Sequence, residues 1–458
     1  MYNHIFQAQH LLLLPFFTIF AQKYFCMHRD CINKLINWKQ RPNRKPLILR
    51  GARQVGKTWL LKEFARRAYT KYVYVNFEQD QVLSQIFATT LDPYKILTAI
   101  ALRHQTTIDE DTLIIFDEIQ AAHGGVTALK YFCEDAPQYH VVAAGSLLGI
   151  AMHHGDSFPV GKVEFLDLYP LSFREFLIAC GDEPMVELIA SKNWDMVALV
   201  KDTLIERLRT YYFVGGMPEA VQCYCDTKDF GRVQTIHRNI LDTYENDFSK
   251  HAPAFEVPRI RMVWHSVIAQ LAKENRKFIY GMLRQGARAK DFELAIQWLA
   301  DAGLIYTIHR TKKADLPLKA YEDFAAFKIF MLDVGLMCSA AGINADSLLC
   351  GNALFNSFRG GLTEQFVCQQ LQDCVDAIYY WSAENSSGEI DFLVQNEGQI
   401  HPIEVKAEEN LRAKSLAAFV ASNPSLHGLR LSMSDYRQQQ WMTNYPLYTI
   451  FALFPKKE

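Results

Sequence analysis

Short apolar runs alternate with helical patterns through the first 180 residues of the chain. Strand-type runs occupy 46–50, 71–78, 112–117 and 139–148, where apolar residues follow one another with few polar breaks. After the first run, residues 57–69 place apolar side chains three and four positions apart, which is typical of an amphipathic helix. Buried strands that alternate with helices predict an α/β fold with a doubly wound parallel sheet.

The segment between the first strand and this helix is GARQVGKT, from Gly51 to Thr58. It has the G-x-x-x-x-G-K-[ST] spacing, in which glycines allow a tight turn and successive N–H groups meet phosphate oxygens beside a helix N-terminus. Lys57 is expected to reach the β/γ-phosphates, and the Thr58 hydroxyl to ligate Mg²⁺. A chance glycine-rich turn is the alternative, but the strand before it and the helix after it favour a nucleoside triphosphate site. The binding residues expected here are Gly51, Gln54, Val55, Gly56, Lys57, Thr58 and Trp59.

Two acids end the third apolar run, in the segment IIFDE. Asp117 is expected to hold Mg²⁺ through water, and Glu118 to polarise the water that attacks the phosphate. An apolar strand that ends in two acids is by itself usually a solvated strand end. Its place after the glycine loop and the 71–78 strand favours the second half of a nucleotide site, and Glu118 points to ATP hydrolysis.

From about residue 252 the pattern changes to helices with clustered cations. A helix is expected over 292–302, ending at Gly303, and two strands follow it, which is the order of a winged helix-turn-helix. Cations precede this helix and occupy the expected wing: Arg284, Arg288, Lys290, Arg310, Lys312 and Lys313. They could contact DNA phosphates. They could equally be a solvated surface, because the acids Glu293 and Asp301 dilute their charge.

The segment GEIDFLVQNEGQIHPIEVKAEE contains two alternating runs around Glu397-Gly398, which predicts a β-hairpin. Counting outward from that turn pairs Phe392 with Ile403 and Asp391 with Glu404. One face of the hairpin is then apolar, and the other carries the acids.

Directly opposed side chains in a hairpin have Cβ atoms about 5 Å apart, so Asp391 and Glu404 would repel unless a divalent cation lay between them. Lys406, on the same side as Glu404, could orient or deprotonate a water. The sequence therefore predicts a second divalent-cation site, with a surface hairpin of mixed charges as the alternative.

Composition adds limits rather than a function. The chain has 458 residues, half of them hydrophobic, and a net charge of −2, so any nucleic-acid surface must be local. Its ten cysteines include one C-x-C, Cys223 and Cys225, and no C-x-x-C or zinc-type spacing. They are expected to be reduced thiols in a cytoplasmic protein.

The apolar run from Leu11 to Phe20 is shorter than the ~20 residues of a membrane-spanning helix, and Pro15 interrupts it. It also lacks the flanks of a signal peptide. No membrane association is expected, and residues 1–26 are interpreted as an extension upstream of a start at Met27.

Taken together, the segments resemble the bacterial and archaeal AAA-type ATPases of the single-chain kind that carry a C-terminal module of unassigned function. The matching segments occur in one order: RGARQVGKT, IIFDEIQ, AAGSLLG, VEFLDLYPLSFREFL, YYFVGGMPEAV, ILDTYENDFSK, FKIFMLDVGL and GLTEQFV. The resemblance implies that Ser146 is a polar sensor of the γ-phosphate. Many relatives have an arginine after a glycine where this chain has Lys162, and lysine lacks the bidentate clamp of arginine, so the arginine finger is not identified.

The last hairpin resembles the D…E-x-K pattern of PD-(D/E)XK nucleases, in which Glu364 matches the acid on the first helix. The implied metal ligands are Glu364, Asp391 and Glu404, with Glu404 and Lys406 in catalysis. The expected organisation is an N-terminal extension (1–26), an AAA-type ATP-binding domain (27–180), a helical lid (181–250), a winged helix-turn-helix (251–345) and a smaller α/β nuclease-like domain (346–458).

Two functions stay open. The chain could hydrolyse ATP to control a DNA-directed, metal-dependent nuclease module. Alternatively, it could be a nucleotide-switched DNA- or protein-binding regulator in which the nuclease-like fold is catalytically silent. ATP and Mg²⁺ are the expected cofactors, DNA is a candidate partner, and oligomerisation is left open.

Overall fold

The computed structural model describes residues 27–145, 159–273, 276–345, 356–383, 388–408 and 413–456. The expected extension at 1–26 and the expected sensor Ser146 lie outside the described residues. No helix within the described ranges is long and apolar enough to cross a membrane.

A parallel sheet forms the first part of the molecule. Its order is β2-β3-β4-β1-β5, and its strands are β1 (Leu47–Arg50), β2 (Tyr72–Asn76), β3 (Leu113–Asp117), β4 (His140–Ala144) and β5 (Glu164–Asp167). The helices that pack on it are α1 (Cys31–Gln40), α2 (Lys57–Ala68), α3 (Gln81–Thr89), α4 (Pro93–Arg103) and α5 (Gly125–Asp135).

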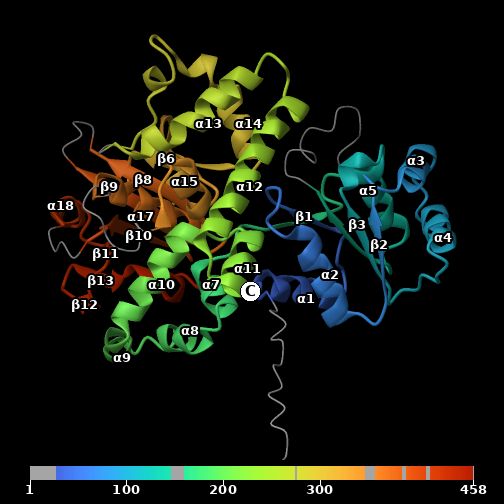
Figure 1. The fold of residues 1–458 in the computed structure, drawn as a ribbon, viewed down its shortest axis with the longest axis horizontal. Coiled ribbons are helices and arrows are strands. Elements are labelled where there is room, and N and C mark those ends of the chain that lie inside the picture. The colour runs from blue at the N-terminus through green and yellow to red at the C-terminus, as the bar shows by residue number, and fades with distance from the viewer. Residues whose placement is uncertain are drawn as a thin grey trace, which may run out of the picture.

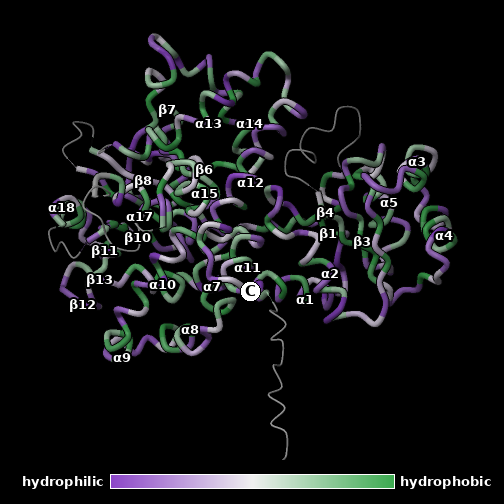
Figure 2. The backbone as a smooth tube through the Cα atoms, viewed as in Figure 1, coloured by the Kyte–Doolittle hydropathy of each residue, from purple (hydrophilic) through white to green (hydrophobic). Residues whose placement is uncertain are grey.

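Both faces of this sheet are buried. Leu47 and Leu49 of β1 belong to the core that includes α1 and α2, while Ile48 belongs to the core that includes α3, α4 and α5. Neighbouring residues of a strand point to opposite faces, so a strand covered on both sides must be apolar throughout. Figure 2 shows this continuous hydrophobic character along β3. The predicted doubly wound parallel sheet is confirmed.

Helices occupy most of the chain after β5. They are α7 (Phe173–Ala179), α8 (Glu183–Ala190), α9 (Trp194–Leu199), α10 (Lys201–Val214), α11 (Pro218–Thr227), α12 (Phe230–His251), α13 (Val257–Leu271), α14 (Glu293–Asp301), α15 (Val334–Ala340), α17 (Asn356–Leu371), α18 (Lys414–Ser422) and α19 (Ile450–Leu453). Short 3₁₀ turns lie at η1 (Ile119–Ala121), η2 (Tyr280–Met282), η3 (Ala289–Asp291), η4 (Leu318–Tyr321) and η6 (Leu447–Thr449). In Figure 1 the long α12 runs between the two sheets of the molecule.

The second sheet is mixed and has the order β12-β13-β11-β10-β9-β8-β6-β7. Its strands are β6 (Ile305–Thr311), β7 (Glu322–Met331), β8 (Ala377–Ser382), β9 (Glu389–Asn396), β10 (Gln399–Val405), β11 (Gly428–Ser432), β12 (Arg437–Gln438) and β13 (Met442–Pro446). The helix-strand-strand order of α14, β6 and β7 is the one expected. However, β6 pairs in parallel with β8, so the two strands of the expected wing form one edge of the C-terminal sheet.

The predicted register of the last hairpin is confirmed. β9 and β10 pair from Asn396 with Gln399 to Phe392 with Ile403. Glu397 and Gly398 have φ values of 50° and 72°, which suits a two-residue hairpin turn. Beyond the paired residues, the backbone N–H of Val405 donates to Asp391 Oδ2 at 2.7 Å.

A buried carboxylate joins the helical region to the C-terminal part. Asp333 caps α15 by accepting from the N–H groups of Gly335 and Leu336, and it also accepts from Gly216 N at 2.6 Å and Gln369 Nε2 at 3.0 Å. We call this contact the Asp333 junction. A Cβ on Gly215, whose φ is 67°, would lie 2.1 Å from Asp333 Oδ1, so the position requires glycine.

Next to the junction, His237 of α12 is 1% exposed, and its Nε2 lies 3.0 Å from the Val214 carbonyl oxygen. A carbonyl can only accept, so this nitrogen carries the hydrogen. Burial lowers the pKa of His237 to about 4, and the hydrogen bond to Val214 opposes that shift only in part.

We expect His237 to make the free energy of unfolding depend on pH. The unfolded chain binds this proton near pH 6.5 and the folded chain only near pH 4, so stability is full above pH 6.5 and falls as pH drops toward 4. For this pKa gap the loss between pH 7.5 and pH 5 is about 2 kcal/mol. Urea unfolding of the parent and of His237→Gln at both pH values measures it. An equal pH dependence in the two proteins would contradict the assignment.

Candidate nucleotide site and C-terminal acid cluster

The glycine loop joins the end of β1 to the start of α2. Gln54 and Gly56 have φ values of 65° and 94°, and these left-handed conformations turn the chain sharply into the helix. The first N–H groups of a helix have no intrahelical partner and carry its positive dipole end. The loop is backed by α11, because a Cβ on Gly56 would lie 3.3 Å from Pro218 Cγ. The geometry of the loop and helix together suits an anion.

Lys57 lies inside this loop. The residue is 7% exposed, and its Nζ donates to the carbonyl oxygens of Gly51 and Ala52, both at 2.9 Å. Burial lowers the pKa of Lys57 to about 8, although Glu118 and Asp117 oppose the shift. Of the other expected binding residues, Val55 is fully buried and Trp59 packs partly buried against the core, so their side chains support the loop.

Thr58 and Asp117 meet as the sequence predicts. Thr58 Oγ1 donates to Asp117 Oδ2 at 2.7 Å, and the Tyr74 hydroxyl donates to the same oxygen at 2.7 Å. A hydroxyl and a carboxylate suit Mg²⁺, which takes oxygen ligands, keeps several waters and needs few protein groups. The residues present therefore fit the expected ion. The contact of Tyr74 with Asp117 was not predicted, because the alternation of Tyr74 with Val73 and Val75 indicates only a strand.

Glu118 follows Asp117 with φ 51°, a left-handed conformation that is uncommon for glutamate. Its backbone N–H donates to Asp117 Oδ1 at 3.2 Å, and Gln120 Nε2 donates to its side-chain oxygen. Strain of this kind costs on the order of 1–3 kcal/mol and gathers at functional sites. The backbone turn and Gln120 together fix the direction of the Glu118 carboxylate.

Lys162 lies away from this arrangement. Its Nζ pairs with Glu134 Oε1 of α5 at 2.8 Å. The loop also contacts α12, because Arg53 Nη1 pairs with Asp247 at 2.5 Å and its carbonyl accepts from the Tyr244 hydroxyl at 2.8 Å. Two side chains of α12, in the helical region, therefore hold the glycine loop in place.

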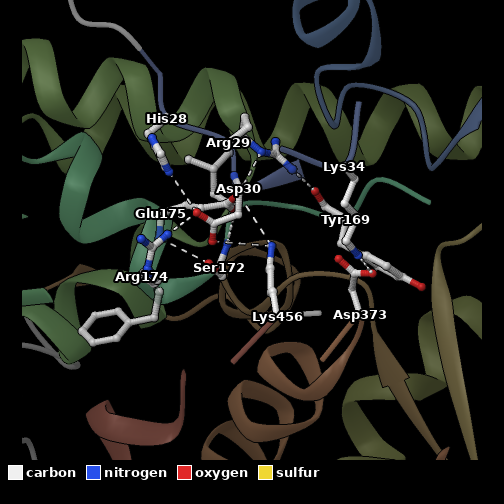
Figure 3. Close-up of polar contacts among 12 residues, drawn as sticks. His28, Arg29, Asp30, Lys34, Tyr169, Ser172, Arg174, Glu175, Asp373 and Lys456 are labelled. Atoms are coloured by element: carbon white, nitrogen blue, oxygen red, sulfur yellow. Dashed lines mark hydrogen bonds and ion pairs between the residues drawn. The ribbon is translucent and has the colours of Figure 1, made fainter. Parts of the chain in front are cut away.

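A buried ion network fastens the other side of the loop (Figure 3). Arg29 donates to the carbonyl oxygens of Val55 and Tyr169, at 3.1 and 2.5 Å, and its Nε lies 3.4 Å from Glu175. Lys456 approaches the same carboxylate at 3.6 Å. Burial opposes charge on Glu175, but Lys456 and Arg29 hold its pKa below the usual value.

The sequence analysis missed this network. The S-x-x-E spacing of Ser172 and Glu175 is a visible capping-box signal, and both of its hydrogen bonds are present at α7. That signal could have placed Glu175 at a helix start. Nothing in the spacing indicates that Arg29 and Lys456 lie beside it.

A cavity of about 230 Å³ lies beside the loop. Gly51, Ala52 and Val55 line one side, and Ala300 and Tyr306 of the α14–β6 region line the other. The nucleotide site therefore borders the part of the chain that leads into the second sheet.

The acids expected in the C-terminal domain gather beside the second sheet. Glu364 on α17 and Glu404 on β10 are buried, and Asp391 lies on β9. Lys406 Nζ pairs with Glu404 Oε1 at 2.9 Å, whereas Glu404 Oε2 is buried with no hydrogen-bond partner in the described chain. Burial and the nearby Glu364 raise the pKa of Asp391 well above its ordinary value.

Two cations that the sequence analysis did not assign to this cluster also enter it. Lys328 of β7 is completely buried and contacts Glu364 Oε2 at 3.5 Å, and it pairs with Glu389. Arg276 pairs with the other oxygen of Glu364. We call Glu364, Glu389, Asp391, Glu404, Arg276, Lys328 and Lys406 the acid cluster.

The expected three-ligand metal centre stays a prediction. Within the described residues, no group of three or more His, Cys, Asp or Glu side chains is arranged to hold a metal ion. Glu364 pairs with Arg276 and Lys328 and is also hydrogen-bonded to the Asp391 side chain. Asp391 and Glu404 remain on one face, as the hairpin register requires.

Comparisons with known proteins support the first domain. Residues 43–177 match a family model described as an AAA domain, and residues 205–347 and 359–452 match two families described as domains of unknown function. Among curated proteins none matches this chain.

Solved structures with a similar fold include the Walker-type ATPase of Pyrococcus abyssi, at 12% identity and TM-score 0.43, covering 69% of this chain and 96% of that one. The ORC1 protein of Aeropyrum pernix in complex with DNA aligns at 12% identity and TM-score 0.28, over 72% and 96%. The RuvB branch migration motor of Thermotoga maritima aligns at 14% and 0.29, over 61% and 89%. The glycine loop, the Thr58–Asp117 contact and the matched family model together support an AAA-type P-loop ATPase fold for residues 43–177.

Proposed function

We propose that this chain hydrolyses ATP at the glycine loop and that its nucleotide state controls a DNA-directed, nuclease-like C-terminal module. The observation that carries the first part is the convergence of Lys57, Thr58, Asp117 and Glu118 at the carboxyl ends of β1 and β3. Ligands of open parallel sheets bind at this edge, outside the strand ends.

In the proposed reaction, the loop amides and Lys57 hold the β- and γ-phosphates. Glu118 orients the water that attacks the γ-phosphate. Mg²⁺, when bound, neutralises charge on the phosphate oxygens. Thr58 and Asp117 would hold that ion, with Tyr74 fixing the Asp117 carboxylate. Ser146, expected to sense the γ-phosphate, and an oligomer that supplies an arginine in place of Lys162 remain part of the proposal.

Control of the C-terminal module is favoured by the position of α17. This helix carries Glu364 of the acid cluster and, one turn later, Gln369 and Gln370, which reach the Asp333 junction and the Tyr211 hydroxyl. The junction includes Gly216, two residues before Pro218, which lies against Gly56 of the loop. A short series of packed contacts therefore connects the loop to the acid cluster.

Two observations bear on whether the C-terminal module is an active nuclease or a regulator without nuclease activity. The unpartnered Glu404 Oε2 favours a divalent cation beside Glu404 and Asp391, because a cation would satisfy that buried oxygen. Neutralisation of Glu364 by Arg276 and Lys328 favours the second candidate, a nucleotide-switched binding protein with a silent nuclease-like fold.

The ATP site is tested by substitution. Lys57→Ala should lose ATP binding, because the loop then lacks its charge. Glu118→Gln should bind ATP but hydrolyse it about 10²–10⁴ times more slowly, because glutamine cannot act as the base. Binding by calorimetry and turnover by phosphate release measure both effects. The matched control is Glu110→Gln, an exposed acid before β3, which should behave as the parent. Parental turnover by Glu118→Gln would remove this residue from the mechanism.

The C-terminal cation site is tested with Mn²⁺ as the probe. If Asp391 and Glu404 share a cation, an Asp117→Asn variant, which lacks the carboxylate of the nucleotide site, should still bind Mn²⁺ in calorimetry. Asp391→Asn in that background should bind at least about tenfold more weakly. Glu397→Gln, at the hairpin turn, is the control. Cleavage of labelled single- and double-stranded DNA, with and without ATP, then separates the two functions. Mn²⁺ binding without DNA cleavage would favour the function as a regulator. The absence of Mn²⁺ binding would refute the cation site.

DNA contact is tested through salt. Arg284, Arg288 and Lys312 are exposed, whereas Arg310 pairs with Asp323 at 2.9 Å and is left out of the test. If the exposed three bind duplex phosphates, their triple alanine variant should lower the log–log salt slope by about 0.9 per lost contact. Fluorescence anisotropy from low to moderate salt measures the slope. Lys192→Ala, an exposed residue in the helical region, is the control, and an unchanged slope would exclude this surface.

A further inference from the structure

Two cysteines meet at the far ends of α7 and α11. Cys180 is the residue directly after α7, and Cys225 lies in the last turn of α11. Their sulfur atoms are 3.5 Å apart, within hydrogen-bonding distance, and both residues are partly exposed. The ATPase mechanism uses neither thiol.

The surroundings distinguish the two thiols. The hydrogen bond from Cys225 lowers the pKa of Cys180 although burial opposes it, and the nearby Lys228 and Arg207 act in the same direction. The same hydrogen bond and burial raise the pKa of Cys225. A thiolate is the nucleophile in thiol–disulfide exchange, so the lowered pKa favours Cys180 as the attacking sulfur and Cys225 as the resolving one.

The chain offers an internal comparison at Cys223. This residue is also partly exposed and lies two positions before Cys225 on the same helix, but its sulfur is 3.8 Å from the Thr227 hydroxyl. Positions two apart on a helix do not share a face. The C-x-C pair of the sequence is therefore divided: Cys225 faces Cys180, and Cys223 has a hydroxyl neighbour.

We infer that Cys180 and Cys225 are a redox-active pair that closes to a reversible disulfide in the presence of a small-molecule disulfide such as oxidised glutathione. Cys180 thiolate attacks one sulfur of glutathione disulfide, forms a mixed disulfide and releases one glutathione thiolate. The Cys225 thiol gives its proton to a base, and the resulting thiolate attacks Cys180 sulfur and releases the second glutathione thiolate. Two protein thiols are oxidised to one disulfide, and one glutathione disulfide is reduced to two thiols.

The location gives this bond a structural effect. The N-terminus of α7 carries Ser172 and Glu175 of the network that holds Arg29 against the glycine loop, and the N-terminus of α11 carries Pro218 against Gly56. A disulfide between Cys180 and Cys225 would join the C-terminal ends of α7 and α11, and the N-terminal ends of the same two helices support the loop. It also closes a chain loop in the unfolded state, which stabilises the folded form.

The test uses the full chain and oxidised glutathione as the probe. After incubation and alkylation, mass spectrometry of non-reduced peptides should find Cys180 joined to Cys225, and reductant should restore both thiols. The thermal unfolding midpoint of the oxidised parent should rise by about 3–10 °C. Cys223→Ser should behave as the parent in both measurements.

Two variants examine the order of the steps. Cys225→Ser should stop at a mixed disulfide with one glutathione on Cys180, and Cys180→Ser should gain no disulfide at Cys225. Free thiols at Cys180 and Cys225 in the oxidised parent, or a disulfide from Cys180 to Cys223, would overturn the inference. The parent protein alone decides this outcome, so it does not depend on how the variants fold.

Discussion

A carboxylate removed from water must have its oxygens fully hydrogen-bonded, and Asp333 satisfies this requirement with donors from three distant segments. The Gly215-Gly216 turn, the start of α15 and Gln369 of α17 are all held by this one carboxylate. Losing one donor leaves a buried charge that costs about 1–3 kcal/mol or more. The placement of the ATPase domain against the second sheet depends on this arrangement, because the turn beside Asp333 continues into the helix behind the glycine loop.

The same constraint lies on the series of packed contacts between the nucleotide site and the acid cluster. α17 is anchored at Gln365, whose amide bonds both backbone groups of Met331, and at Gln369 in the junction. Under the proposed control, a rearrangement at the junction would displace Glu364, which lies on the same helix. Arg276 and Lys328, which bind Glu364 from the segment before α15, would have to follow or release it. The proposed control of the C-terminal module therefore has a definite structural requirement, namely a second arrangement of α17.

Local patterns predicted the features that depend on neighbouring residues. The glycine loop, the Thr58–Asp117 contact and the register around Glu397-Gly398 follow from spacing and from the period of a strand. Long-range partners could not be predicted in this way. Lys328 and Arg276 enter the acid cluster because β7 and the segment before η2 pack against α17, and no sequence period records that packing. For the same reason, the pairing of β6 with β8 was not expected, since a parallel neighbour can come from anywhere in the chain.

The parallel contact between Arg310 and Tyr380 has a consequence for how this protein could be divided. A fragment that ended near residue 345 would leave β6 without one neighbour, and a fragment that began there would leave β8 open along its length. Open strand edges recruit other chains, so each piece would be prone to aggregate. Folding must also bring together strands that are about seventy residues apart, which slows it and prolongs exposure of those edges. The two regions that match families of unknown function thus share one sheet in this chain, and their biochemistry is best studied with both present.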